Sequence, residues 1–123
     1  MERDVSWRDQ VALVRAMWDA WNDGRMDDVA ATMHPDVLWR PITRPGRSEY
    51  RSPDGVRQMR ADIEQLRGTM DVLIDEVIAT EGDTVRTTGH VKFAVDPDKT
   101  PFAVVFSFRD GLIFLAETVY GRE

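Results

Sequence analysis

The second half of the chain is made of four apolar segments separated by short turns. The segments read MDVLIDEVIAT, TVRTTGHVKFAV, PFAVVFSF and LIFLAETVY, and the turns between them read EGD, DPDK and RDG. Apolar segments with period-two alternation, bounded by Asp, Gly and Pro, are typical of β-strands joined as hairpins. Strands joined by such short turns pair antiparallel. The pattern therefore predicts a four-stranded antiparallel meander that ends at the C-terminus.

The first half of the chain opens with a helical pattern. Apolar residues recur at three- and four-residue steps from Val11 to Trp21, before Gly24. This spacing predicts an amphipathic helix, and Ser6 and Asp9 have the spacing of a pair that caps its N-terminus.

Three further elements are predicted between this helix and the meander. MDDVAATM is expected to be a short helix that ends at His34-Pro35, where the histidine would meet the negative end of the helix dipole. DVLWR indicates a short strand, and PITRPGRSEYRS a loop or an edge hairpin. Ser52 is expected to cap the third helix, with Pro53 at its first position and Gly68 at its end.

The order of these elements indicates the fold class. A chain of 123 residues is expected to form a single domain over residues 1–123. Helices come first and an antiparallel meander last, which is typical of α+β proteins. We predict a cone-shaped, strongly curved antiparallel sheet packed against three helices of the N-terminal half. A sheet curved in this way encloses a cavity.

Charge and composition exclude several function classes. Acidic residues outnumber basic ones by 22 to 16, and the net charge of −6 argues against a nucleic-acid partner. The absence of Cys removes disulfides and thiol chemistry and fits a reducing cytoplasm. No apolar stretch has the length of a membrane helix, so we expect a cytoplasmic protein with no membrane partner. The two histidines lie far apart in sequence, so no metal site is predicted.

Three stretches of the sequence resemble a known family. VRAMWDAWNDGRMDDVAATMHPDVLWRP, YRSPDGVRQMRADI and FSFRDGLIFLAETVY are similar, in order and spacing, to nuclear transport factor 2-like proteins of the SnoaL-like group. The resemblance implies the cone-shaped fold. It also implies cyclase, isomerase or hydrolase chemistry without a cofactor, although the family includes non-catalytic binding and dimerisation modules.

The catalytic positions of two related enzyme groups carry other residue types in this chain. The resemblance to ketosteroid isomerases places Pro41 at the position of the base, and Met17 and Val104 at the positions of the oxyanion donors. Ketosteroid-type isomerisation is therefore disfavoured. The resemblance to limonene epoxide hydrolases places their acids and arginine at Gly89, Val91 and Thr118, so that constellation is also missing.

Strand register decides whether an acid–base pair can lie inside the cone. The family register points the even-numbered residues from 102 to 120 inward on the last two strands. His90 and Glu117 then lie on the outer face, where they could share an ionic contact or a water molecule. A slip of one residue would bring both into the cone as an acid–base pair. Tyr50, which offers a hydroxyl group, is the third candidate for a catalytic residue.

We therefore predict a pocket for a small apolar or aromatic molecule. Its expected lining is Trp18, Trp21, Trp39, Met59, Thr87, Val91, Phe102, Val104, Phe106, Thr118 and Tyr120. Such a pocket is mostly apolar with a few hydroxyl groups to orient the ligand. The alternative is a non-catalytic dimerisation module whose cone is filled by its own aromatic side chains.

The outer face of the sheet suggests a second partner. Val105, Ile113, Leu115 and Val119 are expected to form an outward row that is too apolar for a freely solvated surface. The sequence therefore predicts a homodimer formed through this outer face.

Overall fold

A computed structural model describes residues 2–41 and 49–120. The helices are α1 (Glu2–Asp23), α2 (Met26–Ala31) and α3 (Ser52–Arg67). The strands are β1 (Met33–Arg40), β2 (Tyr50–Arg51), β3 (Met70–Thr80), β4 (Thr84–Phe93), β5 (Asp96–Arg109) and β6 (Leu112–Tyr120). No helix in these ranges is both long and apolar enough to cross a membrane.

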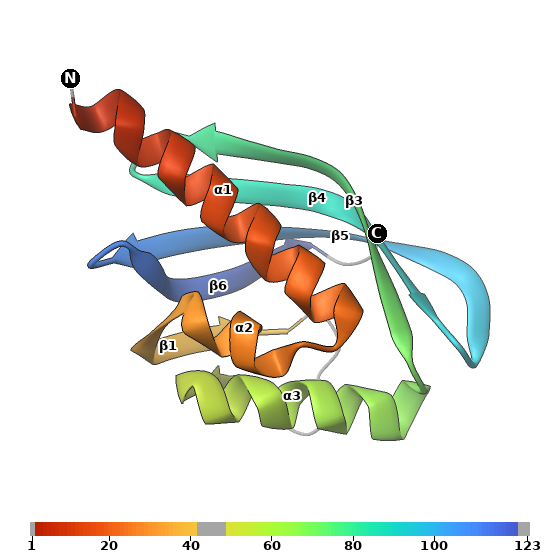
Figure 1. Cartoon of the computed structure of the whole chain (residues 1–123). Helices are drawn as coiled ribbons and strands as arrows, with labels where there is room; N and C mark the ends of the chain where they lie inside the picture. The colour runs from red at the N-terminus through yellow and green to blue at the C-terminus, as the bar shows by residue number, and fades with distance from the viewer. Residues whose placement is uncertain (1, 42–48, 121–123) are drawn as a thin grey trace.

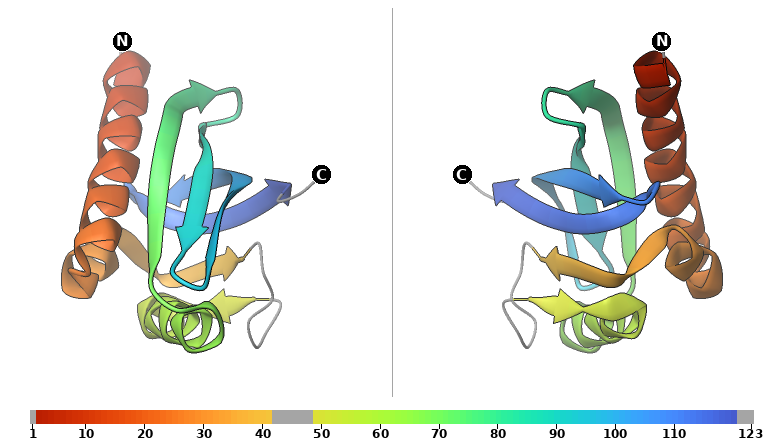
Figure 2. Two further views of the ribbon diagram at one scale, coloured as in Figure 1. Left: turned by 90° about the vertical axis from the view of Figure 1, so that its right-hand side faces the viewer. Right: turned by 90° about the vertical axis from the view of Figure 1, so that its left-hand side faces the viewer.

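The strands form one curved sheet in the order β2-β1-β6-β5-β4-β3. The strands from β3 to β6 are the predicted antiparallel meander, and the pair of β1 and β6 is parallel. Helix α1 crosses one face of the sheet, and α3 closes one end of it (Figure 1). Figure 2 shows the resulting cone from two sides. The predicted α+β fold is confirmed.

The helices differ from their predicted bounds in places. Helix α1 already begins at Glu2, so Ser6 lies inside the helix and is not its N-cap. The Ser52 hydroxyl accepts a hydrogen bond from the Gly55 amide at 3.3 Å, as expected of a residue that caps the start of α3. The chain leaves α3 at Gly68, which has a φ of 81°.

Strand β1 begins earlier than predicted, which changes the setting of His34. This residue lies in the strand and not at a helix end, because the chain becomes extended from Met33 onward. The Thr32 carbonyl accepts a hydrogen bond from the Ile113 amide at 2.9 Å, which pairs this part of the chain with β6. The His34 Nδ1 accepts a hydrogen bond from the Asp36 amide, and its ring packs edge-on against Phe114.

The predicted DPDK turn is wrong. Strand β5 includes this segment, and the turn lies at residues 94–95. The Ala94 amide donates a hydrogen bond to the Thr69 carbonyl at 2.8 Å, which continues the pairing of β4 with β3 up to this turn. A register shift next to Phe93 takes up the additional residues of β5.

A bulge in β6 corrects the predicted outer row. Ser107 pairs with Leu115 and Phe108 pairs with Ile113, so Phe114 is the extra residue on β6. Strict alternation therefore fails at this point. Ile113 turns inward and is fully buried, although the register predicted it on the outer face.

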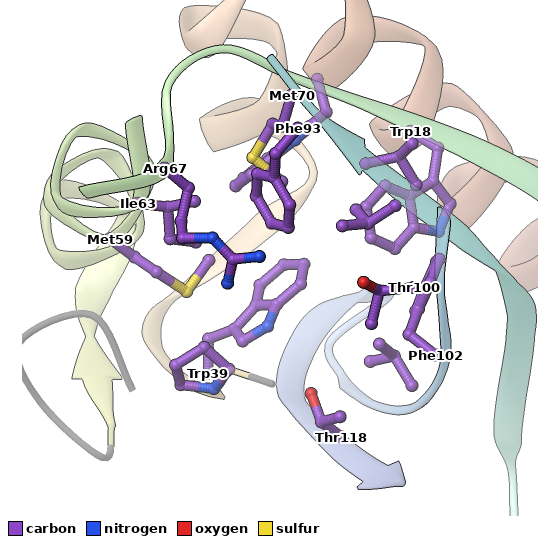
Figure 3. Close-up of a pocket in the computed structure, with 15 residues that line it drawn as sticks. Trp18, Trp39, Met59, Ile63, Arg67, Met70, Phe93, Thr100, Phe102 and Thr118 are labelled. Atoms are coloured by element: carbon purple, nitrogen blue, oxygen red, sulfur yellow. The ribbon is translucent and has the colours of Figure 1, made fainter. Parts of the chain in front are cut away.

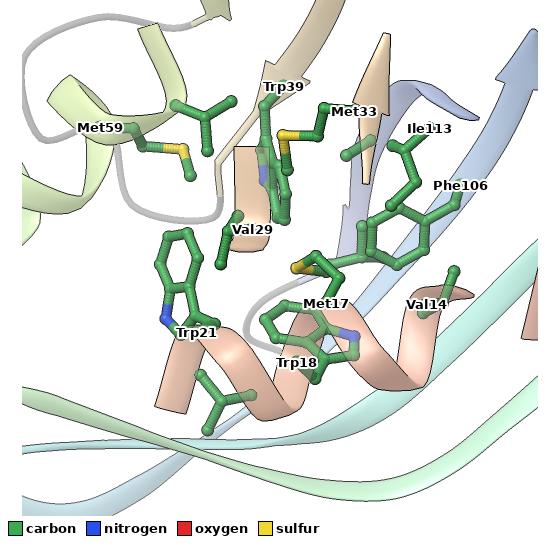
Figure 4. Packing of buried hydrophobic residues seen from close by; sticks show 14 of the residues in the cluster. Val14, Met17, Trp18, Trp21, Val29, Met33, Trp39, Met59, Phe106 and Ile113 are labelled. Carbon is green, nitrogen blue, oxygen red and sulfur yellow. The ribbon is translucent and has the colours of Figure 1, made fainter. Parts of the chain in front are cut away.

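The other inward-facing positions follow the predicted alternation. Val85, Thr87 and Val91 of β4 are buried, whereas Arg86 and Lys92 between them are exposed. On β5 the side chains of residues 102, 104 and 106 are buried as predicted, but Ala103, which the register predicted on the outer face, is fully buried as well. These strands and the two long helices enclose an apolar core that includes three tryptophans (Figure 4).

Candidate functional site

A pocket lies between the two long helices and the concave face of the sheet (Figure 3). The side chains that line it are Trp18, Trp21, Trp39, Pro41, Met59, Ile63, Arg67, Met70, Val72, Val91, Phe93, Thr100, Phe102, Val104 and Thr118. The cavity measures about 70 Å³, and the free space with the open mouth included measures about 580 Å³. The pocket is therefore narrow and mostly apolar.

Three indole rings form the inner wall of the pocket. Trp21 and Trp39 stack with their planes 26° apart and their ring centroids separated by 5.9 Å. Trp18 meets both rings edge-on. It also packs against Phe102, with 5.8 Å between the two ring centroids. Figure 4 shows the three indoles side by side in the core. Flat aromatic surface in these orientations suits an aromatic ligand, which can stack or pack edge-on in the same way.

The orientation of Trp18 is fixed by a buried hydrogen bond. Its Nε1 donates to the Thr87 hydroxyl at 3.1 Å, and Thr87 is fully buried. Thr87 is not among the lining residues, so it acts by holding an indole that is. The sequence predicted direct contact between Thr87 and a ligand, and this position does not match that prediction.

Few polar groups belong to the described lining. The Thr118 hydroxyl donates to the Arg40 carbonyl at 2.7 Å, and Thr100 is half-buried. The Trp21 Nε1 is buried and has no hydrogen-bond partner among the residues that the structure describes. Arg67, at the end of α3, brings a positive charge to the pocket.

Most of the predicted ligand-binding residues come together in this pocket. Those that line it are Trp18, Trp21, Trp39, Met59, Val91, Phe102, Val104 and Thr118. Phe106 is fully buried and packs against Trp18 and Trp39 from the core side. The side chain of Tyr120 lies outside the described residues. Whether any of these residues binds a ligand stays a prediction.

Sequence reasoning missed several lining residues. They are Ile63, Arg67, Met70, Val72, Phe93 and Thr100. The period-two pattern of β3 and β4 contains Val72 and Phe93 and could have revealed them. Arg67 reads in the sequence as a basic residue in the last turn of a helix, and this signal does not distinguish a side chain in solvent from one that enters a pocket.

His90 and Glu117 lie outside the pocket lining, as the family register predicted, but each has another partner and the suggested contact between them does not form. The Glu117 carboxylate pairs with the guanidinium of Arg40, its neighbour on β1, at 2.9 Å and is about half exposed. The His90 Nδ1 lies 3.4 Å from the Asp75 carboxylate, on the neighbouring strand β3. Strand β5 separates the two residues, and neither lines the pocket.

The third catalytic candidate, Tyr50, is also outside the pocket lining. Tyr50 is buried, and its hydroxyl lies 2.7 Å from the Asp62 carboxylate. It ties the edge strand β2 to α3.

The positions taken from the resemblance to enzymes converge on the same pocket. Pro41, Val91, Val104 and Thr118 line it, although none of them carries an ionisable group. Met17 is fully buried. Within residues 2–41 and 49–120, no three His, Cys, Asp or Glu side chains are grouped so as to hold a metal ion.

Comparison with solved structures gives similar folds. The structure of TerC co-crystallised with polyporic acid is 20% identical, covers 91% of each chain and has a TM-score of 0.79. A candidate polyketide cyclase from Sinorhizobium meliloti is 15% identical, covers 87% of this chain and 93% of its own, and has a TM-score of 0.74. An NTF2-like protein of unknown function from Burkholderia pseudomallei is 19% identical, covers 91% of this chain and 90% of its own, and has a TM-score of 0.79.

Comparison at the level of sequence identifies the family. No match was found among curated proteins. A profile of the SnoaL-like domain matches residues 14–116, which include every lining residue of the pocket except Thr118. Since the match spans most of the chain, this protein belongs to the SnoaL-like domain family and has the nuclear transport factor 2-like fold.

Proposed function

We propose that the protein binds a small apolar or aromatic molecule in its cone. The observation that carries this proposal is the indole-lined pocket, in which Trp18, Trp21 and Trp39 leave an open, mostly apolar space. Met59 and Met70 border the same space, and their flexible side chains allow the narrow interior to adapt to a ligand. The similarity in fold to TerC, which was co-crystallised with polyporic acid, also supports a small-molecule ligand.

The same pocket supports a narrower hypothesis about chemistry. Cyclisation, isomerisation or hydrolysis without a cofactor is the activity that the family resemblance favours, and a candidate polyketide cyclase shares the fold. The described lining offers apolar surface, two hydroxyl groups and one guanidinium. These groups can orient a reactive molecule and exclude water from it. We place the protein in the cytoplasm on the sequence grounds given above.

The alternative, a cone filled by its own side chains, has less support. Dense packing would leave no opening between α1, α3 and the sheet, whereas the pocket has an open mouth and a free interior. The three indoles pack against one another at the inner end of the cone and leave a narrow space beside them.

Binding can be tested with 2-naphthalenemethanol, a neutral aromatic probe. Three of the four tryptophans line the pocket and Trp7 is exposed, so the experiment uses a Trp7→Phe background. We expect the probe to change the tryptophan fluorescence in a saturable way. Thr100→Phe should block the pocket, and its matched control is Lys99→Phe, since Lys99 is exposed and adjacent on β5. Equal binding by both variants would contradict the proposal.

A further inference from the structure

Arg67 is the one charged side chain in the described lining of the pocket. Figure 3 shows its guanidinium reaching from the last turn of α3 into the ring of lining side chains. The Arg67 Cζ lies 4.2 Å from the centroid of the Phe93 ring. At this distance the guanidinium is attracted to the face of the ring by a cation–π interaction. Arg67 therefore brings a positive charge to a mostly apolar surface.

The position of Arg67 needs more than the helix dipole to explain it. A basic side chain in the last turn of a helix is favoured by the dipole wherever it points, and most such side chains extend into water. Arg67 is half-buried and lies among the lining residues. The net charge of the chain is −6, so the positive charge at the pocket is a local feature and not part of a general basic surface.

Trp21 provides a second, independent observation. It is 1% exposed, lines the pocket, and its Nε1 has no acceptor among the described residues. By contrast, the Trp18 Nε1 is bonded to Thr87. Buried N–H groups in native proteins are nearly always paired, so an unpaired one on a lining residue calls for an explanation, and a ligand oxygen would supply one.

We propose that the pocket selects aromatic molecules that carry a carboxylate or another anionic oxygen. Arg67 holds the anion, and the Trp21 N–H donates to an oxygen of the same ligand. This inference rests on the proposed function and adds the chemical class of the ligand to it. The aromatic body would lie against the indoles, with its acidic group toward the end of α3.

The expected selectivity follows from the low polarity of the surroundings. A charge-assisted hydrogen bond is stronger than a neutral one, and both are stronger away from water. For an aromatic acid compared with a neutral molecule of the same shape, this predicts tighter binding on the order of ten- to a hundredfold.

The test compares 2-naphthoate with 2-naphthalenemethanol on the Trp7→Phe protein. The dissociation constants are measured by fluorescence for the unaltered pocket, for Arg67→Met and for Arg67→Lys. Methionine keeps an apolar stem against Phe93 and removes the charge, whereas lysine keeps the charge. Arg57→Met is the matched control, because Arg57 lies on the same helix and pairs with Asp27 outside the pocket.

We expect the unaltered pocket to prefer the acid, Arg67→Met to lose the preference, and Arg67→Lys and Arg57→Met to keep at least part of it. In NMR spectra, 2-naphthoate should shift the indole N–H signal of Trp21 more than that of Trp18. Equal affinity for the two probes in the unaltered pocket overturns the inference, even if Arg67→Met fails to fold, and leaves the proposed function in place. Binding of neither probe overturns both.

Discussion

At the scale of single residues, the most consequential contact is the hydrogen bond between Trp18 and Thr87. It joins α1 to the concave face of β4 across 69 positions of sequence. Both partners are buried, so the Trp18 N–H cannot turn to water if the hydroxyl is lost. The contact therefore contributes both to stability and to the shape of the pocket wall.

Replacing this hydroxyl should destabilise the protein. Thr87→Val keeps the shape of the side chain but leaves the Trp18 N–H unpaired, which we expect to lower the free energy of unfolding by about 1–3 kcal/mol. Urea unfolding followed by circular dichroism measures this change. Thr88→Val is the control, because Thr88 is half-buried on the opposite face of β4, and it should change stability by less than about 0.5 kcal/mol. Equal losses in both variants would refute the assigned role.

At the scale of elements, the curvature of the sheet depends on Gly89. A Cβ built on this residue would lie 2.1 Å from the Leu73 carbonyl oxygen of the neighbouring strand. The register between β3 and β4 shifts next to this contact, between Ile74 and Glu76. A glycine opposite a bulge lets two strands approach closely while the sheet bends. Gly89 thus takes part in forming the hollow of the cone.

A single methyl group at this position should therefore be costly. Gly89→Ala meets a backbone atom, which cannot move aside as a flexible side chain would, and we expect a loss of more than about 2 kcal/mol in unfolding free energy. Gly55→Ala is the matched control in the first turn of α3, where the nearest atom would lie at 3.4 Å. That variant should be neutral or slightly stabilising, because alanine favours helices. Similar melting temperatures for the two variants would argue against this account of the bend.

The elements also show how much of the fold can be predicted from the sequence. Periodicity and turn residues are local signals, so the order of helices and strands and the inward parity of Phe102 and Val104 were predictable. The bulge at Phe114 was not, because it depends on how β6 fits between two partner strands. Likewise, the entry of Arg67 into the pocket depends on the packing of α3 against the sheet.

At the scale of the whole molecule, one face of the sheet carries no helix among the described residues (Figure 2). Half-buried Leu38 pairs there with half-buried Leu115, and Val105 lies on the neighbouring strand. This apolar group differs from the predicted outward row of Val105, Ile113, Leu115 and Val119, because Ile113 is buried in the core. The side chain of Val119 lies outside the described residues. A homodimer through this face remains our prediction.

The predicted homodimer can be tested by light scattering. At micromolar concentration the measured mass should be twice the 14.1 kDa of one chain. Leu115→Lys places a charge in the proposed interface and should reduce the mass to that of a single chain. Leu66→Lys is the control, because Leu66 lies on α3 and is 60% exposed, and it should leave the mass unchanged. A single-chain mass for the unaltered protein would contradict the predicted dimer.

The lining of the pocket comes from both long helices and from every strand except β2. A bound molecule would therefore touch parts of the chain that are brought together only by complete folding, and the unfolded chain would have no comparable site. Occupancy and folding are then thermodynamically linked. At a free ligand concentration one hundred times the dissociation constant, the folded state would gain about 2.7 kcal/mol. A genuine ligand should thus shift the unfolding transition of the entire domain as one unit.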